Sequence, residues 1–143
     1  KGWMLINTGN KSEACMGYST LYGDSAGAFA PLGGIYKTEV FALAEYINNQ
    51  SGKPKEIIPD NILTKAPSAE LAYNQTDEAS LGIDYEHLDI ILKLHVEMGL
   101  GPADIAAKVS DVDVAAVHRI VSTYASYAYK RAQLPPCPDV RFY

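Results

Sequence analysis

The sequence predicts an α/β fold in which one or two strands at the N-terminus are followed mostly by helices. Residues 3–6 are four consecutive apolar residues, a run typical of a strand that is buried on both faces. Residues 40–47 place apolar side chains at helical spacing, and residues 84–134 do so again. We therefore expect a short α/β portion at the front and a helical portion at the back.

The composition is that of a single globular domain. With 143 residues and a hydrophobic fraction of 48%, the chain is long enough to bury a core. The net charge of -5 argues against a nucleic-acid surface, and no apolar run approaches the roughly 20 residues that cross a membrane. Having only Cys15 and Cys137 favours a reducing compartment, and we expect a cytoplasmic protein. Because the chain begins without methionine inside a strand-like run, we also expect a piece of a longer protein.

The pattern divides the chain into four segments. Residues 1–50 form the α/β portion with a functional loop, and residues 51–83 form a loop-rich connection. Residues 84–134 form the helical portion, and residues 135–143 form a tail.

In the α/β portion, Asn10 is expected to cap a short helix. Glu13 follows at the spacing of a capping box. Residues 22–34 are rich in glycine and alanine and predict a functional or mobile loop. The next helix contains Val40 to Ile47 and ends at residues 51–54.

In the connection, a short helix is expected to begin at Pro59 and to end at Thr64. Residues 65–71 predict a loop, because Pro67 disfavours helix at the residue before it. Residues 74–82 predict a polar linker without regular structure.

In the helical portion, Asp84 is expected to cap a helix that Gly99 closes. Residues 101–109 predict a short helix, and Ser110 is expected to cap the last and longest one. That helix has an apolar seam made of Val114, Val117, Val121, Tyr124 and Ala128. The seam suits helix packing and leaves open an alternative function, a helical interaction or dimerisation module without catalytic activity.

Some side chains are poor candidates for chemistry. His87, His95 and His118 have no second His or Cys at ligand spacing, so we expect ordinary helix-surface histidines. Cys15 has no basic partner nearby and is expected to be a small buried apolar residue. Residues 103–120 have the outline of a helix-turn-helix, but their acidic character favours packing over DNA binding.

Glu13 and Asp24 are better candidates, because carboxylates near a strand end can hold Mg²⁺ beside substrate phosphates. Lys37, Lys65 and Ser68 add cationic and hydroxyl groups suited to binding phosphate. The alternative for each residue is a helix cap or a solvated surface position.

Several segments resemble, in order, the C-terminal part of the synthetase domain of NAD⁺ synthetase. They are TGNKSE, GYSTLYGD, APLGGIYKTEVFALAEY, IPDNILTKAPSAEL, QTDEASLGIDYEHLD and YKRAQLPP. The resemblance covers essentially the whole chain and implies a portion of an adenine nucleotide α-hydrolase-like domain. It is stronger toward the long, glutamine-dependent members, because the short ammonia-dependent members more typically read T-D-H-x-x-E in place of TGNKSE.

The resemblance implies an ATP-dependent ligase that amidates deamido-NAD⁺ to NAD⁺ through an adenylated intermediate. It implies ATP as a substrate, Mg²⁺ as a cofactor, and a glutaminase domain in the same polypeptide that supplies ammonia. It also implies a homo-oligomer, and no nucleic-acid or membrane partner.

The family's site residues transfer position by position. The resemblance assigns ATP binding to Thr8, Lys37 and Ser68, and metal binding to Glu13. It assigns deamido-NAD⁺ binding to Glu13, Tyr18, Ser19, Thr20, Leu21 and Lys130. Leu21 stands where the short members have a substrate-binding lysine, so that particular contact does not transfer. Asp24 belongs to a shared Tyr-Gly-Asp and receives no certain role.

The family's SGGxDS pyrophosphate loop, which contains a metal-binding aspartate, does not occur in these 143 residues. Without its backbone donors, we predict that the isolated chain has no synthetase activity and binds ATP weakly. A steady-state, ammonia-dependent assay of NAD⁺ formation tests this prediction, and robust turnover by the isolated chain would contradict it.

Overall fold

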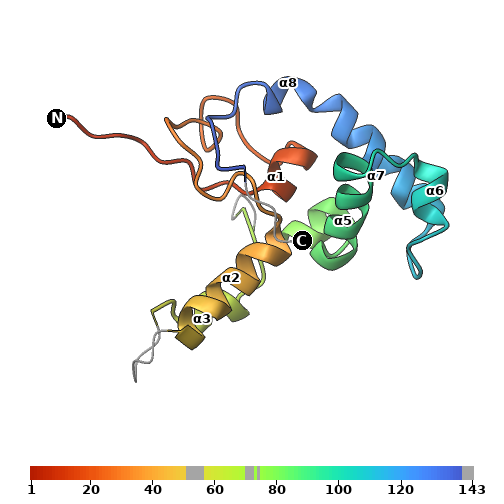
Figure 1. The fold of residues 1–143 in the computed structure, drawn as a ribbon, viewed down its shortest axis with the longest axis horizontal. Helices are drawn as coiled ribbons and strands as arrows, with labels where there is room; N and C mark the ends of the chain where they lie inside the picture. Colours follow the sequence, from red (N-terminus) through yellow and green to blue (C-terminus); the bar gives the residue numbers. More distant parts are fainter. Residues whose placement is uncertain (51–56, 70–72, 74, 140–143) are drawn as a thin grey trace.

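The computed structural model describes residues 1–50, 57–69, 73 and 75–139, and this part of the chain is mostly helical (Figure 1). The α-helices are α1 (Lys11–Met16), α2 (Lys37–Gln50), α3 (Asp60–Thr64), α4 (Asp77–Leu81), α5 (Tyr85–Leu92), α6 (Pro102–Ala106), α7 (Val114–Ser126) and α8 (Ala128–Arg131). A π-helical turn, η1 (Lys93–Glu97), continues α5. Helices α1, α5 and α7 form the body, from which α2 and α3 extend together (Figure 1).

The hydrophobic core is built around α5. Leu88, Ile91 and Leu92 on this helix are completely buried. They belong to one cluster with Ile105 of α6, with Val117 and Ile120 of α7, and with Cys15, Met16, Tyr36 and Tyr85. Burying a large apolar side chain contributes about 1.5–3 kcal/mol, so this cluster is the main source of stability in the described residues.

Two predicted N-terminal caps and one predicted helix end are present in the structure. The Asn10 side chain accepts the Glu13 N–H at 3.0 Å while the Glu13 carboxylate accepts the Asn10 N–H at 3.2 Å, so the predicted capping box is present. Asp84 caps α5 by accepting the His87 N–H at 2.9 Å. Gly99, whose φ of +69° suits glycine, closes η1 as expected.

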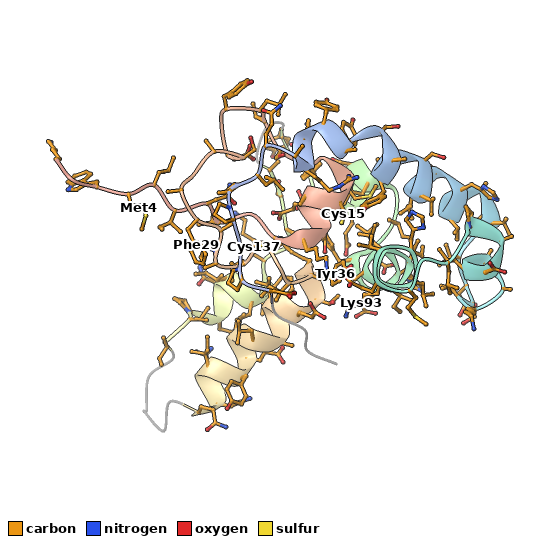
Figure 2. All side chains as sticks on the ribbon, turned by 45° about the horizontal axis from the view of Figure 1, so that its top comes forward. Met4, Cys15, Phe29, Tyr36, Lys93 and Cys137 are labelled. Atoms are coloured by element: carbon orange, nitrogen blue, oxygen red, sulfur yellow. The ribbon has the colours of Figure 1, made fainter. Side chains whose placement is uncertain are left out.

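The predicted strand at residues 3–6 is wrong. Trp3 and Ile6 are 86% and 41% exposed, and Met4 lies on an extended segment that leaves the helices (Figure 2). The only β-pairing of residues 3–6 among the described residues is one parallel bridge between Ile6 and Phe29. A strand buried on both faces needs neighbours on both sides and a layer over each face, and a single bridge supplies neither.

The predicted linker at residues 74–82 contains helix α4, so that prediction is wrong where the structure describes it. Thr76 caps the helix by accepting the Ala79 N–H at 3.2 Å, and Gly82 ends it in a left-handed conformation with φ of +70°. The helix is only five residues long and has few apolar side chains, so periodicity did not reveal it. Helix α3 also begins at Asp60, one residue after Pro59.

The last predicted helix has a different N-cap from the one expected, and it is neither the last nor the longest helix among those described. Asp113, not Ser110, caps α7, because Asp111 adopts a left-handed φ of +66° that keeps the preceding residues out of the helix. Helix α7 has 13 residues against 14 in α2, and α8 follows it. The apolar face that packs on the core is centred on Val117 and Ile120, whereas Val114 is 53% exposed.

None of the helices in the described ranges is both long enough and apolar enough to span a bilayer.

The apolar face of α2 is half-buried at most, because the outer half of this helix extends beyond the core. Residues 51–54, expected to end α2, lie largely outside the described part of the chain.

The junction between α1 and α8 depends on a glycine. Gly17 ends α1 with φ of +63°, and a Cβ at this position would lie 2.2 Å from Cγ of Tyr127. Arg131 of α8 donates to the carbonyl oxygen of Cys15 at 3.3 Å, which ties α8 to the last turn of α1. Only glycine satisfies both the backbone conformation and the close approach of the Tyr127 ring.

We predict that Gly17→Ala destabilises the protein much more than Gly99→Ala. Gly99 has a similar φ of +69° but no atom within 4 Å of a built Cβ, so its substitution isolates the cost of backbone strain. Strain of this kind costs about 1–2 kcal/mol, and the collision with Tyr127 should add about 1–3 kcal/mol for Gly17→Ala. Urea unfolding of the two variants measures the difference, and equal losses would contradict the account.

Candidate functional site

A cavity of about 240 Å³ opens between the segment before α1, helix α1 itself, the loop that follows it and the chain after α8. Polar residues form one part of its lining: Asn7, Thr8, Asn10, Glu13, Tyr18, Ser19, Asp24 and Ser25. Small and apolar residues form the rest: Gly9, Ala14, Ala30, Gly33, Leu134, Pro135 and Cys137. Cys137, labelled in Figure 2, is one of these residues. A mixed lining of this kind suits a ligand with both an apolar and a polar part.

Asn7 fixes the wall of the cavity. Its side-chain amide donates to the carbonyl oxygens of Asp24 at 2.8 Å and Ala26 at 3.1 Å, and its side-chain oxygen accepts the Gly9 N–H at 2.9 Å. Asn7 is 4% exposed, so these bonds satisfy a buried polar group. Asn7 was not among the predicted site residues, although a polar residue directly after an apolar run was the available signal.

Glu13 and Lys37, both predicted site residues, are brought together. Lys37 Nζ lies 3.1 Å from Glu13 Oε1, while Oε2 of the same carboxylate completes the capping box. The two side chains are only 21% and 17% exposed, so the ion pair is shielded from solvent. Glu13 therefore shapes α1 and also presents a partnered carboxylate to the cavity.

The start of α2, which positions Lys37, is held by a buried carboxylate. Asp89 of α5 is 1% exposed and accepts the Thr38 N–H and hydroxyl, each at 2.8 Å. Its other oxygen accepts the Ser12 hydroxyl of α1, and Ser12 Oγ in turn accepts the Lys37 N–H at 2.8 Å. Burial raises the pKa of Asp89 above its usual range, although hydrogen bonds from Ser12 and Thr38 oppose the shift.

The loop after α1 is held from two sides. Lys130 donates to the carbonyl oxygens of Gly17 at 2.7 Å and Ser19 at 2.6 Å, so it lies behind the loop. The Tyr18 hydroxyl accepts from Gln75 Nε2 at 3.1 Å. Thr20 donates its N–H to the Asp24 carboxylate, which closes the turn. Tyr18 and Ser19 therefore reach the cavity from a braced segment.

The predicted site residues fall into two groups in the structure. Thr8, Glu13, Tyr18 and Ser19 line the cavity, as does Asp24, to which no certain role was assigned. Lys37 adjoins it through Glu13. The other predicted residues lie outside the lining: Thr20, Leu21, Ser68 and Lys130.

The acidic residues fit a metal ion only together with a ligand that brings its own oxygens. Glu13 and Asp24 both line the cavity, yet no group of three His, Cys, Asp or Glu side chains forms a metal site in the described residues. Mg²⁺ is usually held by one or two carboxylates plus phosphate oxygens and water, and this pair can supply the protein's share.

His87, His95 and Cys15 lie outside the cavity lining. His87 pairs with Asp84 on the surface, and His95 Nδ1 lies 2.9 Å from the Leu100 carbonyl oxygen. Cys15 is 2% exposed, and burial raises its pKa to about 12. The expectation of a small buried apolar residue at Cys15 is confirmed, and such a thiol is not a nucleophile at neutral pH.

The described residues enclose a cavity with a mixed polar and apolar lining. Residues 1–135 match the NAD synthase family, and the chain therefore belongs to this family. The predicted resemblance is confirmed, as is the identity of the chain as a portion of the synthase domain.

Known relatives include both types of NAD⁺ synthetase. The chain is 46% identical over 132 residues to the glutamine-dependent NAD(+) synthetase of Thermotoga maritima, covering 92% of this chain and 22% of that protein. It is 39% identical over 138 residues to the NH(3)-dependent NAD(+) synthetase of Wolinella succinogenes, covering 96% of this chain and 49% of that protein. The chain thus spans between about a fifth and a half of these relatives.

Two solved structures superpose on this chain. The NMN synthetase of Francisella tularensis superposes with a TM-score of 0.65 at 32% identity, covering 96% of this chain and 47% of that one. A glutamine-dependent NAD(+) synthetase from Cytophaga hutchinsonii superposes with a TM-score of 0.70 at 19% identity and shares the fold.

We predict that Asp89→Ala lowers the free energy of unfolding by about 3 kcal/mol, because Ser12 and Thr38 would lose their buried acceptor. Because the folded pKa of Asp89 is raised, its contribution is complete below the unfolded pKa of about 3.9 and declines as pH rises through the folded value. The stability difference from wild type should therefore shrink as pH rises above the unfolded pKa.

Urea unfolding at several pH values measures this difference. Asp104→Ala on the exposed surface of α6 is the control and should cost less than about 0.5 kcal/mol. A difference that grows with pH would contradict the assignment of Asp89 as a buried carboxyl with a raised pKa.

Proposed function

We propose that this chain forms part of the active site of an ATP-dependent ligase that amidates deamido-NAD⁺ to NAD⁺. The observation that carries the proposal is the cavity of an NAD synthase family member in which Thr8, Glu13, Tyr18 and Ser19 converge, with Lys37 paired to Glu13. Ligand pockets usually measure about 300–1,000 Å³, so a cavity of about 240 Å³ suits one part of a large substrate.

Each side of the cavity has its own task in this proposal. Thr8, Lys37 and Ser68 bind ATP. The dinucleotide is bound by Glu13, Tyr18, Ser19, Thr20, Leu21 and Lys130. Because Lys130 already donates to two loop carbonyls, its share includes holding that loop in place.

The proposed chemistry needs no nucleophile from the protein, in agreement with the burial of Cys15. The nicotinate carboxylate attacks the α-phosphorus of ATP and pyrophosphate leaves. Ammonia then attacks the acyl adenylate, AMP leaves, and the amide loses the extra proton. The chain's residues position these groups, and Lys37 stabilises charge on phosphate oxygens. Mg²⁺ bound with Glu13 and Asp24 would neutralise further phosphate charge.

We propose glutamine as the nitrogen source, delivered as ammonia by a glutaminase domain of the same polypeptide. The glutamine-dependent relatives support this proposal, and the NH(3)-dependent relatives define the alternative. The similarity to an NMN synthetase defines a second candidate, amidation of the corresponding mononucleotide. We further propose a cytoplasmic enzyme that works as a homo-oligomer.

The non-catalytic alternative, an interaction module built on the α7 seam, has weaker support. Val117 and Ile120 of α7 are completely buried against the chain's own core. These two side chains are therefore unavailable to a partner.

We predict that Glu13→Gln and Lys37→Ala each lower kcat of the full-length enzyme by about a hundredfold or more, the effect of losing one electrostatic contact to developing charge. His95→Ala is the control and should change turnover little, because His95 contacts the Leu100 carbonyl and the Tyr124 ring. Steady-state NAD⁺ formation is the measurement. The melting temperature of each variant is recorded as well, because loss of the capping box costs about 1 kcal/mol.

Near-normal kcat in both Glu13→Gln and Lys37→Ala would remove support for the site. Rates with deamido-NAD⁺ and with nicotinate mononucleotide, each supplied with glutamine or with ammonium, separate the alternatives. We expect the highest kcat/KM with deamido-NAD⁺ and glutamine.

A further inference from the structure

We propose that Tyr85 and Asp77 are positioning residues for Lys37, and that helix α4 holds the site together from behind. This inference rests on the proposed function, in which Lys37 binds phosphate. The residues involved come from a segment that the sequence predicted to be an unstructured linker, and from the first turn of α5.

The ring of Tyr85 is the second partner of Lys37. Lys37 Nζ lies 5.4 Å from the centroid of this ring, within the range of a cation–π interaction. Tyr85 is 5% exposed, so the interaction is largely shielded from water and is stronger than it would be on the surface. The ammonium group is therefore held between the Glu13 carboxylate and an aromatic ring. If a phosphate displaces Glu13, the ring still fixes the position of the ammonium group.

Asp77 strengthens this arrangement. The Tyr85 hydroxyl donates to Asp77 Oδ2 at 3.0 Å, and Asp77 is 3% exposed. A phenol that donates to a carboxylate has a more electron-rich ring, which binds a cation more tightly. Burial, followed by the charges of Asp77 and Glu13, raises the pKa of Tyr85, so the donor proton stays on the phenol.

The second oxygen of Asp77 indicates a role beyond packing. In the part of the chain that the structure describes, Asp77 Oδ1 is buried without a hydrogen-bond partner. Leaving a buried carboxylate oxygen unpaired is costly, so packing alone does not explain this position. The Asp77 carboxylate lies at the hydroxyl end of the Tyr85 ring.

Helix α4 connects Asp77 to other predicted site residues. The Asp77 N–H donates to the Pro67 carbonyl at 2.8 Å, which anchors the residue before Ser68. Gln75, just before α4, donates to the Tyr18 hydroxyl at 3.1 Å. One short segment therefore supports Lys37, Ser68 and Tyr18.

The test is a double-mutant cycle in the full-length enzyme with kcat/KM for ATP as the readout. Lys37→Met alone should lower kcat/KM by about a hundredfold, and Tyr85→Leu alone by about tenfold. Tyr85→Phe keeps the ring and should lose about threefold or less. In the Lys37→Met background, Tyr85→Leu should have no further effect beyond about twofold, because its role depends on Lys37.

Tyr124→Leu is the matched control. Its half-buried ring lies 3.8 Å from the guanidinium carbon of Arg131, so it loses similar packing and a similar cation contact without touching Lys37. Any effect of this variant should be the same with and without Lys37. If Tyr85→Leu does not fold, Asp77→Asn replaces it and should lower kcat/KM about threefold only when Lys37 is present.

The outcomes separate the two proposals. Unchanged kcat/KM in Lys37→Met would overturn the assignment of Lys37 and thus the proposed site. A large effect of Lys37→Met, with losses from Tyr85→Leu or Asp77→Asn that multiply with it, would leave the proposed function standing. That result would overturn the positioning role of Tyr85 and Asp77.

Discussion

The buried carboxylate of Asp89 is the contact on which the site depends most. It joins three helices that are distant in the sequence, because Ser12 belongs to α1, Thr38 to α2 and Asp89 itself to α5. The two predicted ligand-binding side chains, Glu13 and Lys37, are direct sequence neighbours of these partners. The hydrogen bonds of Asp89 therefore determine where Glu13 and Lys37 meet.

The same arrangement explains how a small helical body can hold a polar site. The apolar cluster around Leu88, Ile91 and Leu92 stabilises α5, and α5 then presents Asp89 to the two neighbouring helix starts. Lys37 and Glu13 neutralise each other at 3.1 Å, which lowers the cost of keeping both side chains largely out of water. A phosphate ligand can take the place of Glu13 at Lys37 without leaving either charge unpaired if a metal ion binds Glu13.

Local features of the sequence predicted local features of the structure. The capping box of Asn10 and Glu13 and the cap at Asp84 follow from residue types at fixed short spacing, and both are present. The resemblance to NAD⁺ synthetases brought Glu13, Lys37, Thr8 and Tyr18 into one proposed site, and three of these line the cavity while Lys37 adjoins it.

Features that depend on distant partners were missed. The run at residues 3–6 was predicted as a buried strand from its apolar side chains, but burial requires neighbours that the described residues do not provide. Asn7 and Asp89 were not singled out, because their roles depend on hydrogen bonds to residues 17 or more positions away. Asp77 was assigned to a linker because its helix is short and polar.

A crystal structure of the full-length protein with deamido-NAD⁺ and an ATP analogue that cannot react at its α-phosphorus shows directly what Lys37 contacts. We expect Lys37 Nζ to move from Glu13 to a phosphate oxygen at about 3 Å while remaining over the Tyr85 ring. We also expect the nicotinate end to contact Tyr18 and Ser19. A bound analogue with the Lys37–Glu13 pair intact, and with no phosphate near either residue, would show that these two residues do not form the phosphate site.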